Sequence, residues 1–299
     1  MSVTRSLSLT ILLALLPVPL LAQEAIDAGR SARHDVAIRI YSLTGSLRIT
    51  AWEHDSVHVR GRVDRGVGKF FFGGTREALK LGVEIPDGVE PDGTADLDIQ
   101  VPAGTRLWVK SAAAEVDITA GGGMVEVING SGRVRVAGRA ESATVETIDG
   151  NVELALESPS GRVRTASGTI VVRGVVRDLE ATTVSGPLLV GMEGAVQRAH
   201  LETVASEIAF KGDLEPEGRL EAETHGGDVE LRLPPRLGAA YHLVSYGGAL
   251  INELVPASAV HPGPHKGEWT FTTGDGRATV DVRTFKGRVT LKVRGDPPR

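Results

Sequence analysis

One ten-residue pattern of apolar and polar positions recurs along the chain. It reads apolar, any residue, Thr or Ser, two variable residues, Gly or another small residue, any residue, apolar, any residue, apolar. Copies start at Ile40, Val109, Val145, Val163, Ala181, Leu201, Ala222, Leu243 and Val282, and a tenth copy at Val125 has Val127 in the Thr/Ser place and two extra residues. The small residues are 18 apart from Ala114 to Gly186 and then 20 or 21 apart. A fixed period near 20 residues predicts an architecture of stacked repeats.

The copy "VRTASGTIVV" indicates what the pattern requires of the backbone. Val163 and Thr165 are two residues apart, so both fit one buried face of a strand. Ile170 and Val172 are spaced likewise, but the odd distance from Thr165 to Ile170 would put the two pairs on opposite faces of a straight strand. A bend at Gly168, which accepts positive φ, lets all four side chains point inward.

The small position of each copy is therefore a predicted turn. The turn glycines are Gly45, Gly132, Gly150, Gly168, Gly186, Gly227, Gly248 and Gly287. We expect positive φ at Gly150 and Gly168. Ala114 and Ser206 replace glycine in two copies, which leaves the turn type there open.

These features predict an all-β fold, because no long stretch has the 3.6-residue period of a helix. We predict a single right-handed parallel β-solenoid, or β-helix, with about ten coils of 18–21 residues and irregular caps. Parallel crossovers are usually right-handed. A left-handed hexapeptide helix would need aliphatic residues six and twelve positions after Val163, and the first of these is Thr169. The Thr/Ser positions should form an internal ladder near the predicted bend of each coil. Their hydroxyls should form hydrogen bonds with the bent backbone or with one another.

The ends of the chain depart from the repeat. We expect one β-solenoid domain over residues 23–299, beginning with an N-terminal coil and cap at 36–104 that carries a loop insertion at 64–95. Regular repeats should fill 105–253, and a C-terminal loop and cap strands should follow at 254–299. Irregular caps are expected because exposed ends invite edge-to-edge growth.

Residues 1–22 have the layout of a secretory signal peptide. Arg5 precedes an apolar run from Leu7 to Leu16, and Ala22 is a suitable last residue before cleavage. An uncleaved anchor is the alternative, although the run is shorter than the roughly 20 residues that span a bilayer. We expect an exported protein, periplasmic or secreted and cell-surface associated, with no transmembrane segment in the mature chain.

Charge and cysteine content narrow the possible chemistry. The chain has 33 Lys and Arg against 38 Asp and Glu, a formal net charge of −5. This argues against a nucleic-acid binder, which would show a basic excess. The absence of cysteine excludes thiolate metal sites, iron–sulfur clusters and a cysteine nucleophile.

Three motifs that resemble functional sites are better explained by structure. His54 and His58 would suit zinc on a helix, but this segment reads as a turn followed by a strand. Lys69 follows glycines but precedes Phe70, not the Ser or Thr of a phosphate-binding loop. The Phe70–Phe72 run either covers the end of the solenoid, which we favour, or contacts a partner or membrane. We therefore predict no catalytic, cofactor-binding or metal-binding residue.

One row of outward positions indicates a partner surface. Val171, Leu189 and Ala209 should stand side by side on three neighbouring coils, where other coils carry charges. An exposed apolar stripe is typical of interaction sites. The alternative is that a C-terminal segment covers the stripe.

Three stretches of sequence resemble a known family. They are "ITAWEHDSVHVRG", "VPAGTRLWVKSAAAEVDI" and the serial "TxSGxVxV" phrases, and the resemblance to the bacterial putative-adhesin family extends over residues 36–291. It implies a β-solenoid in an exported or envelope-associated protein and brings no catalytic residues. The expected role is a non-enzymatic adhesin-like scaffold that binds an envelope or surface protein, a glycan or a surface. The alternative is a carbohydrate-active β-helix enzyme, either a lyase or a hydrolase.

Overall fold

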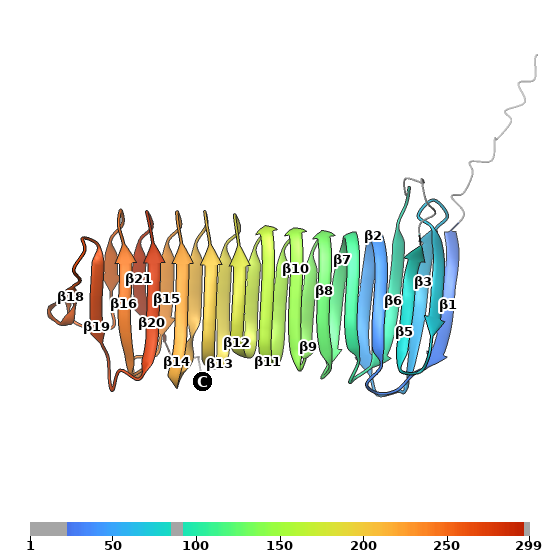
Figure 1. The fold of residues 1–299 in the computed structure, drawn as a ribbon, viewed down its shortest axis with the longest axis horizontal. Coiled ribbons are helices and arrows are strands. Elements are labelled where there is room, and N and C mark those ends of the chain that lie inside the picture. The colour runs from blue at the N-terminus through green and yellow to red at the C-terminus, as the bar shows by residue number, and fades with distance from the viewer. Residues whose placement is uncertain (1–22, 85–91, 296–299) are drawn as a thin grey trace, which may run out of the picture.

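The computed structural model describes residues 23–84 and 92–295, so the expected signal peptide at 1–22 lies outside the described residues. Within these ranges the chain is all-β, and its one helical element is the 3-10 turn η1 (Ala257–Ala259). The strands lie side by side along an elongated body (Figure 1). No helix of the described part is long and apolar enough to cross a membrane.

The described chain forms 21 strands. In chain order they are β1 (Gln23–Ser31), β2 (Ala37–Trp52), β3 (Ser56–Asp64), β4 (Lys69–Gly74), β5 (Ala78–Glu84), β6 (Ala95–Pro102), β7 (Arg106–Gly121), β8 (Met124–Ser131), β9 (Val134–Arg139), β10 (Ser142–Asp149), β11 (Val152–Ser167), β12 (Ile170–Thr183), β13 (Leu188–Thr203), β14 (Ile208–Thr224), β15 (Val229–Leu233), β16 (Ala239–Ser245), β17 (Leu250–Asn252), β18 (His261–Pro262), β19 (Glu268–Thr272), β20 (Ala278–Thr284) and β21 (Val289–Val293).

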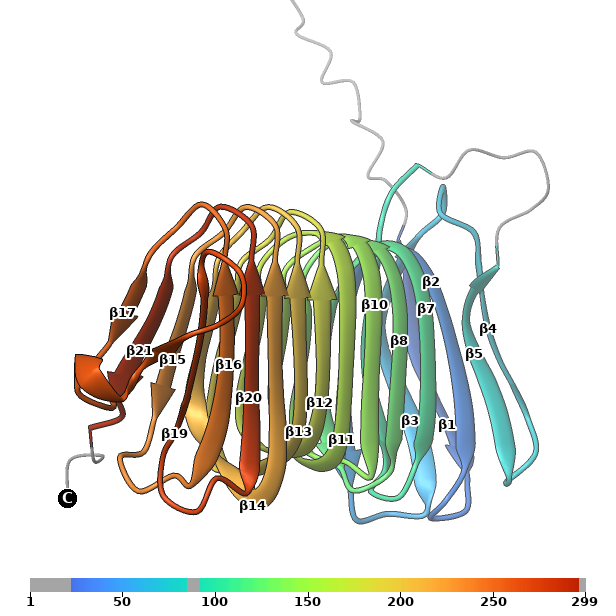
Figure 2. The same ribbon diagram turned by 60° about the vertical axis from the view of Figure 1, so that its left-hand side comes forward.

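Equivalent residues of successive repeats pair in parallel. Val163 of β11 lies between Val145 of β10 and Ala181 of β12, each 18 residues away in the sequence. All 21 strands belong to one continuous hydrogen-bonded sheet. The long strands bend, so this sheet has two halves that face each other across the core (Figure 2), and we call the halves sheet 1 and sheet 2. Sheet 1 has the order β4, β5, β2, β7, β8, β10, β11, β12, β13, β14, β20, β16, β19, β18. Sheet 2 has the order β1, β3, β6, β2, β7, β9, β11, β12, β13, β14, β15, β21, β17.

The core lies between the two sheets and is filled by the apolar positions of the pattern. Val163, Ile170 and Val172 are all fully buried, as the bend predicts. Side chains alternate across a strand, so the intervening residues point outward to solvent. A single repeat could not enclose these aliphatic groups, whereas the stack covers them with the neighbouring coils.

The Thr/Ser position and the small position together build the corner between the sheets. The backbone N–H of Gly287 donates to Thr284 Oγ1 (2.9 Å), and this hydroxyl donates to the carbonyl of Gly227 in the neighbouring coil (3.0 Å). Ser245 repeats the arrangement one coil further, since it accepts from Gly248 and donates to Gly287. A Cβ on Gly287 would collide with the same Gly227 carbonyl. The recurring Thr–x–x–Gly motif thus links neighbouring coils by hydrogen bonds.

Positive φ occurs at only some of the predicted turns. Gly45, Gly132 and Gly168 have φ of +100°, +96° and +114°. Positive φ at Gly150 was wrong, because this residue is not in the left-handed region. Gly150 is required instead by close approach, since a Cβ there would collide with the carbonyl of Gly132. Gly186, Gly227, Gly248 and Gly287 are likewise pressed against the backbone of an adjacent coil.

The tenth copy of the pattern starts two residues later than the sequence reading placed it. Val127, not Val125, pairs with Val109 and Val145, and Asn129 occupies the Thr/Ser place without any insertion. The buried Asn129 side chain accepts a hydrogen bond from Ser111 Oγ and donates to the carbonyl of Ala114 (3.0 Å). At this corner the side-chain amide of Asn129 therefore makes the hydrogen bonds between coils that a hydroxyl makes elsewhere.

The N-terminal end contains more strand than a loop insertion would. Strands β4 and β5 form an antiparallel hairpin inside 64–95, and β5 pairs in parallel with β2. Phe70 and Phe72 pack against the core from this hairpin. The favoured interpretation, that the Phe70–Phe72 run covers the end of the fold, therefore holds for Phe70 and Phe72, whereas Phe71 lies beside Tyr41.

The C-terminal end does not follow chain order. The last coil, β20 and β21, lies between the coil of β14 and β15 and the coil of β16 and β17. It is therefore an inner coil, so the prediction of cap strands at 254–299 was wrong for β20 and β21 and holds for β18 and β19. The end of sheet 1 is formed by β19, which pairs antiparallel with β16, and by the short β18, which pairs antiparallel with β19. The physical reason is that the copy at Val282 has the same corner chemistry as every other copy, so it fits an inner place equally well.

Candidate binding face

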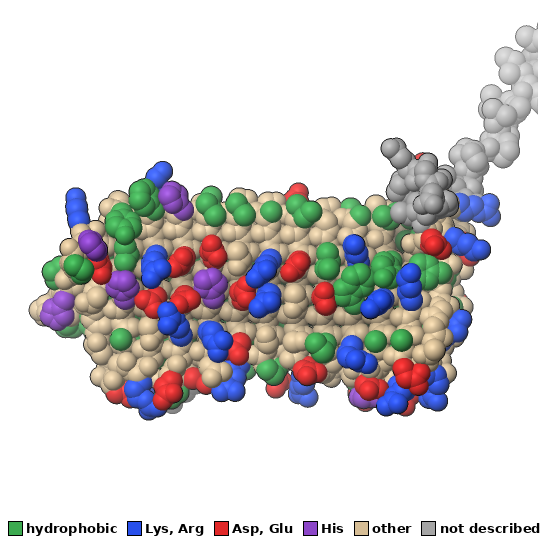
Figure 3. Space-filling view, viewed as in Figure 1, with side chains coloured by type: hydrophobic (Ala, Val, Ile, Leu, Met, Phe, Trp, Pro, Cys, Tyr) green, Lys and Arg blue, Asp and Glu red, His purple; other side chains and the backbone are tan. Residues whose placement is uncertain are grey.

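The outer face of sheet 1 carries a cluster of hydrophobic and basic side chains near the N-terminal end (Figure 3). We call it the basic aromatic patch and define it as Phe71, Lys80, Arg39, Tyr41, Arg106, Trp108, Lys110, Met124 and Glu126. These residues are the outward positions of β4, β5, β2, β7 and β8, which are consecutive strands of the sheet. The strand register therefore brings together residues that are up to 87 positions apart (Arg39 to Glu126).

The rings of the patch contact one another across the strands. Tyr41 lies edge-on to Trp108, with 5.3 Å between ring centroids, and is 6.4 Å from Phe71. Gly82 lies between Phe71 and Tyr41 in the register and offers no side chain to separate their rings. Lys80 Nζ is 4.8 Å from the Tyr41 ring and 5.2 Å from the Phe71 ring, a cation–π arrangement that fixes the rings.

The patch is locally positive in an acidic chain. Arg39, Lys80, Arg106 and Lys110 are all exposed, and among the described residues no carboxylate lies within salt-bridge distance of any of them. The patch contains one carboxylate, Glu126, whose Oε1 accepts a hydrogen bond from Trp108 Nε1 at 3.1 Å. This surface is set up to attract an anionic ligand.

Two shallow hollows meet in the patch. One, of about 620 Å³, is lined by residues of β4, β5 and β2. The other, of about 730 Å³, is lined by residues of β2, β7, β8 and β10, Trp108 among them. Both include Ala37 and Arg39, so together they run across the strands, along the length of the molecule.

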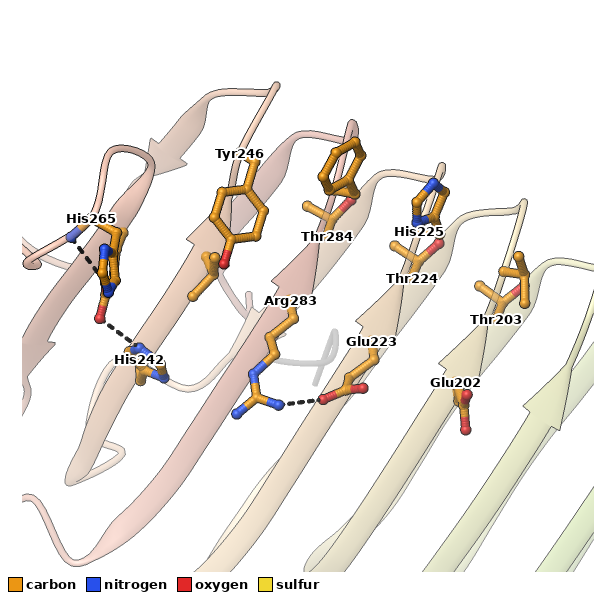
Figure 4. A pocket seen from close by; sticks show the side chains of 14 residues that line it. Glu202, Thr203, Glu223, Thr224, His225, His242, Tyr246, His265, Arg283 and Thr284 are labelled. Carbon is orange, nitrogen blue, oxygen red and sulfur yellow. Dashed lines mark hydrogen bonds and ion pairs between the residues drawn. The ribbon is translucent and has the colours of Figure 1, made fainter.

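A third hollow, of about 460 Å³, lies on the same sheet near the C-terminal end (Figure 4). Its charged groups are already paired: Arg283 Nη1 lies 2.9 Å from Glu223 Oε1, and His242 Nε2 lies 3.0 Å from Glu268 Oε1. At its rim, His225 stacks on Phe285 with 4.9 Å between centroids. This hollow offers hydrogen-bonding groups, and each carboxylate among its described lining residues has a basic side chain within 4 Å.

Two carboxyl groups at or near this hollow, Glu268 and Glu221, have lowered pKa values. The hydrogen bond with His242 lowers the pKa of Glu268. Burial opposes ionisation of Glu221, but hydrogen bonds from Arg219 and His200 outweigh it and the pKa of Glu221 is lowered. A general acid for glycoside cleavage requires a raised pKa. These two groups are therefore tuned for structural ion pairs.

The predicted apolar stripe is assembled as the repeat required. Val171, Leu189 and Ala209 are direct neighbours on β12, β13 and β14, all half-buried on the outer side of sheet 2. They line a hollow of about 270 Å³, with Lys211 among the cations beside them. Residues 278–295 lie elsewhere in the stack, so the described C-terminal segment does not cover the stripe.

The motifs set aside in the sequence occupy structural positions. His58 Nε2 contacts Asp27 Oδ1 at 2.8 Å, while His54 packs edge-on against Trp52. No group of three or more His, Cys, Asp or Glu side chains in the described part of the chain is placed to hold a metal ion. Lys69 lies in β4 and precedes no helix.

Sequence reasoning missed the basic aromatic patch. The available signal was the outward position directly before or after the first apolar residue of each copy. At Ile40 and Val109 these positions hold Arg39, Tyr41, Trp108 and Lys110. Lys80 and Phe71 join the patch through the pairing of β5 and β4. No copy of the repeat pattern predicts these two strands.

No family model and no curated protein matches the sequence. Solved structures that match include one described as a putative adhesin from Parabacteroides distasonis ATCC 8503, with 13% identity, coverage of 90% of this chain and 97% of that chain, and a TM-score of 0.44. Another is described as a putative adhesin from Bacteroides fragilis NCTC 9343 (10% identity, 91% and 98% coverage, TM-score 0.42). A third is described as a putative cell adhesion protein from Clostridium sporogenes ATCC 15579 (9% identity, 91% and 100% coverage, TM-score 0.24). At these values the likeness carries no functional argument.

Proposed function

We propose that the protein is an exported, non-enzymatic adhesin-like scaffold that binds a ligand of the cell envelope or surface through the outer face of sheet 1. Its fold on this proposal is a right-handed parallel β-solenoid, supported by the parallel, 18-residue register of successive coils. The observation that carries the binding role is the basic aromatic patch, because half-exposed rings with cations around them are typical of recognition surfaces.

The enzyme alternative has weaker support. Carbohydrate-active β-helices need two carboxylates with separated pKa values facing a groove. In this chain Glu268 and Glu221 both have lowered pKa values and both contact basic side chains. We therefore propose a binding role without catalysis.

The test is capture of envelope material by residues 23–299 immobilised as bait. Trp108→Ala should abolish most of the capture, because the indole is the largest ring of the patch. Phe285→Ala is the matched control, since it removes an exposed ring at the far end of the same molecule. Equal capture by wild type and Trp108→Ala would overturn the proposed binding face.

A further inference from the structure

The basic aromatic patch has a charge and a spacing that specify a class of ligand. Its rings are surrounded by four cations that have no salt bridge to a described carboxylate, whereas the whole chain has a formal net charge of −5. A nearby anion would therefore be drawn to this place and repelled by much of the remaining surface. The ligand that fits is anionic.

The spacing of the cations favours a chain that lies across the strands. Lys80, Arg39 and Trp108 are direct register partners on β5, β2 and β7, so they follow one another at the strand spacing of about 4.8 Å. A pyranose unit in a polysaccharide is about as long as this spacing of ~4.8 Å. A saccharide chain running along the molecule can thus meet one side chain of the row with each sugar.

The groups that follow the cations suit sugar hydroxyls. Glu126 keeps acceptor capacity beyond its bond with Trp108, and Ser142 and Thr144 line the same hollow. Trp108 and Tyr41 are only half-exposed and hold each other edge-on, so they form a preset apolar platform for a sugar ring. The row therefore passes from basic to neutral and acidic within five strands.

From this arrangement we propose that the patch binds an acidic polysaccharide, one that carries uronate or similar anionic groups among neutral sugars, laid along the two joined hollows. This inference rests on the proposed binding role of the same face. Arg39 and Arg106 pair with the anionic groups, while Trp108 and Tyr41 pack against the sugar rings.

Single-stranded nucleic acid also binds to cations and aromatic rings. It carries a phosphate on every unit, so it needs a long basic track. Here the cations are confined to β5, β2 and β7, a width of about 10 Å at the strand spacing, and Glu126 and Glu146 follow directly on β8 and β10. A ligand with intermittent charge fits better.

The experiment measures binding of polygalacturonate oligomers to residues 23–299 by calorimetry at low and high salt. We expect binding that weakens with salt, and no binding of dextran, a neutral polysaccharide. The double variant Arg39→Gln/Arg106→Gln should lose about tenfold or more in affinity, as the loss of charge-assisted contacts implies.

Arg162→Gln is the matched control and should leave the affinity unchanged. Arg162 occupies the row of Arg39 on the same sheet, but it is paired with Glu180 at 2.9 Å. Tighter binding of oligo(dT) than of polygalacturonate would replace the proposal by nucleic-acid binding. Equal binding of dextran would make the site one for neutral glycans. Failure of both polysaccharides, with Trp108-dependent capture of envelope material intact, would overturn the acidic polysaccharide and leave the scaffold role standing.

Discussion

At the scale of single residues, the corner of each coil explains the sequence best. A hydroxyl accepts from the N–H three residues later and donates to a carbonyl of the adjacent coil, as Thr224 does with Gly227 and Ser206. The glycine is needed because that carbonyl occupies the space of a Cβ. The small residue of the repeat is therefore required by backbone contact between coils. Positive φ is required at only some corners.

Gly186→Ala should lower the free energy of unfolding by about 1–3 kcal/mol, the usual cost of overpacking a well-packed site. Its Cβ would collide with the carbonyl of Gly168. Gly191→Ala is the control, because a Cβ there meets no atom within 4 Å. Urea unfolding of both variants measures the difference. Equal stability of the two would show that the corners tolerate a side chain.

The parallel pairing and the buried positions could be predicted from the sequence, because a period of 18 aligns Val145 with Val163 and Ala181. The copy at Val125 was misplaced because Val127 did not match the Thr/Ser place and an insertion was assumed instead. The distances from Val109 to Val127 and from Val127 to Val145 are both 18, so the period itself held the answer. The part of the patch on β2 and β7 had a signal in the sequence, whereas Lys80 and Phe71 could not be predicted because β5 and β4 carry no copy of the pattern.

At the scale of elements, side chains along each strand alternate between the core and the solvent, so neighbouring residues lie on opposite sides. In β13, Leu188 is fully buried while its neighbour Leu189 is half-buried on the outer surface. The inner rows hold the stack together, and the outer rows are free to carry ligand chemistry. The two sheets therefore have independent outer surfaces, one with the basic aromatic patch and one with the apolar stripe.

Leu189→Glu should leave the melting temperature nearly unchanged, because surface substitutions are usually within about 0.5 kcal/mol. Leu188→Glu, one residue away, should unfold the chain or destabilise it by several kcal/mol, because an unpaired charge would be buried. Thermal melts followed by circular dichroism compare the two. A large loss of stability in Leu189→Glu would mean that the stripe is internal cover and not a partner surface.

At the scale of the whole molecule, acidic and basic side chains link coils along the outer surface. Arg177 pairs with Glu215 at 2.8 Å, and Lys292 pairs with Glu230 at 2.9 Å. Hydrogen bonds to these basic partners lower the pKa of both glutamates. Glu180 behaves in the same way through Arg164 and Arg162. Several contacts between coils thus depend on carboxyl groups that become protonated over the same range of pH.

The stability of the molecule should fall in acid. These carboxyls have lower pKa values in the folded chain than the ordinary 4.5, so the folded state binds protons less readily than the unfolded state. Their contribution is present above about pH 4.5 and is lost as the pH falls through the lowered values. Urea midpoints measured from pH 7 to pH 3 should decline below about pH 4.5. A constant midpoint over this range would show that the pairs do not stabilise the fold.

The inner position of the last coil has a consequence for how the molecule is made. In an ordinary repeat protein the stack grows in order, and loss of the C-terminus shortens it by one unit. Here β16 and β17 are synthesised before β20 and β21 but pair with them, so their places in the stack stay open until residues 278–293 have been synthesised. A protease that removes the tail would take out an interior layer and detach the one beyond it. Strands β20 and β21 are therefore the last to take their places, and the attachment of β16 and β17 to the stack depends on them.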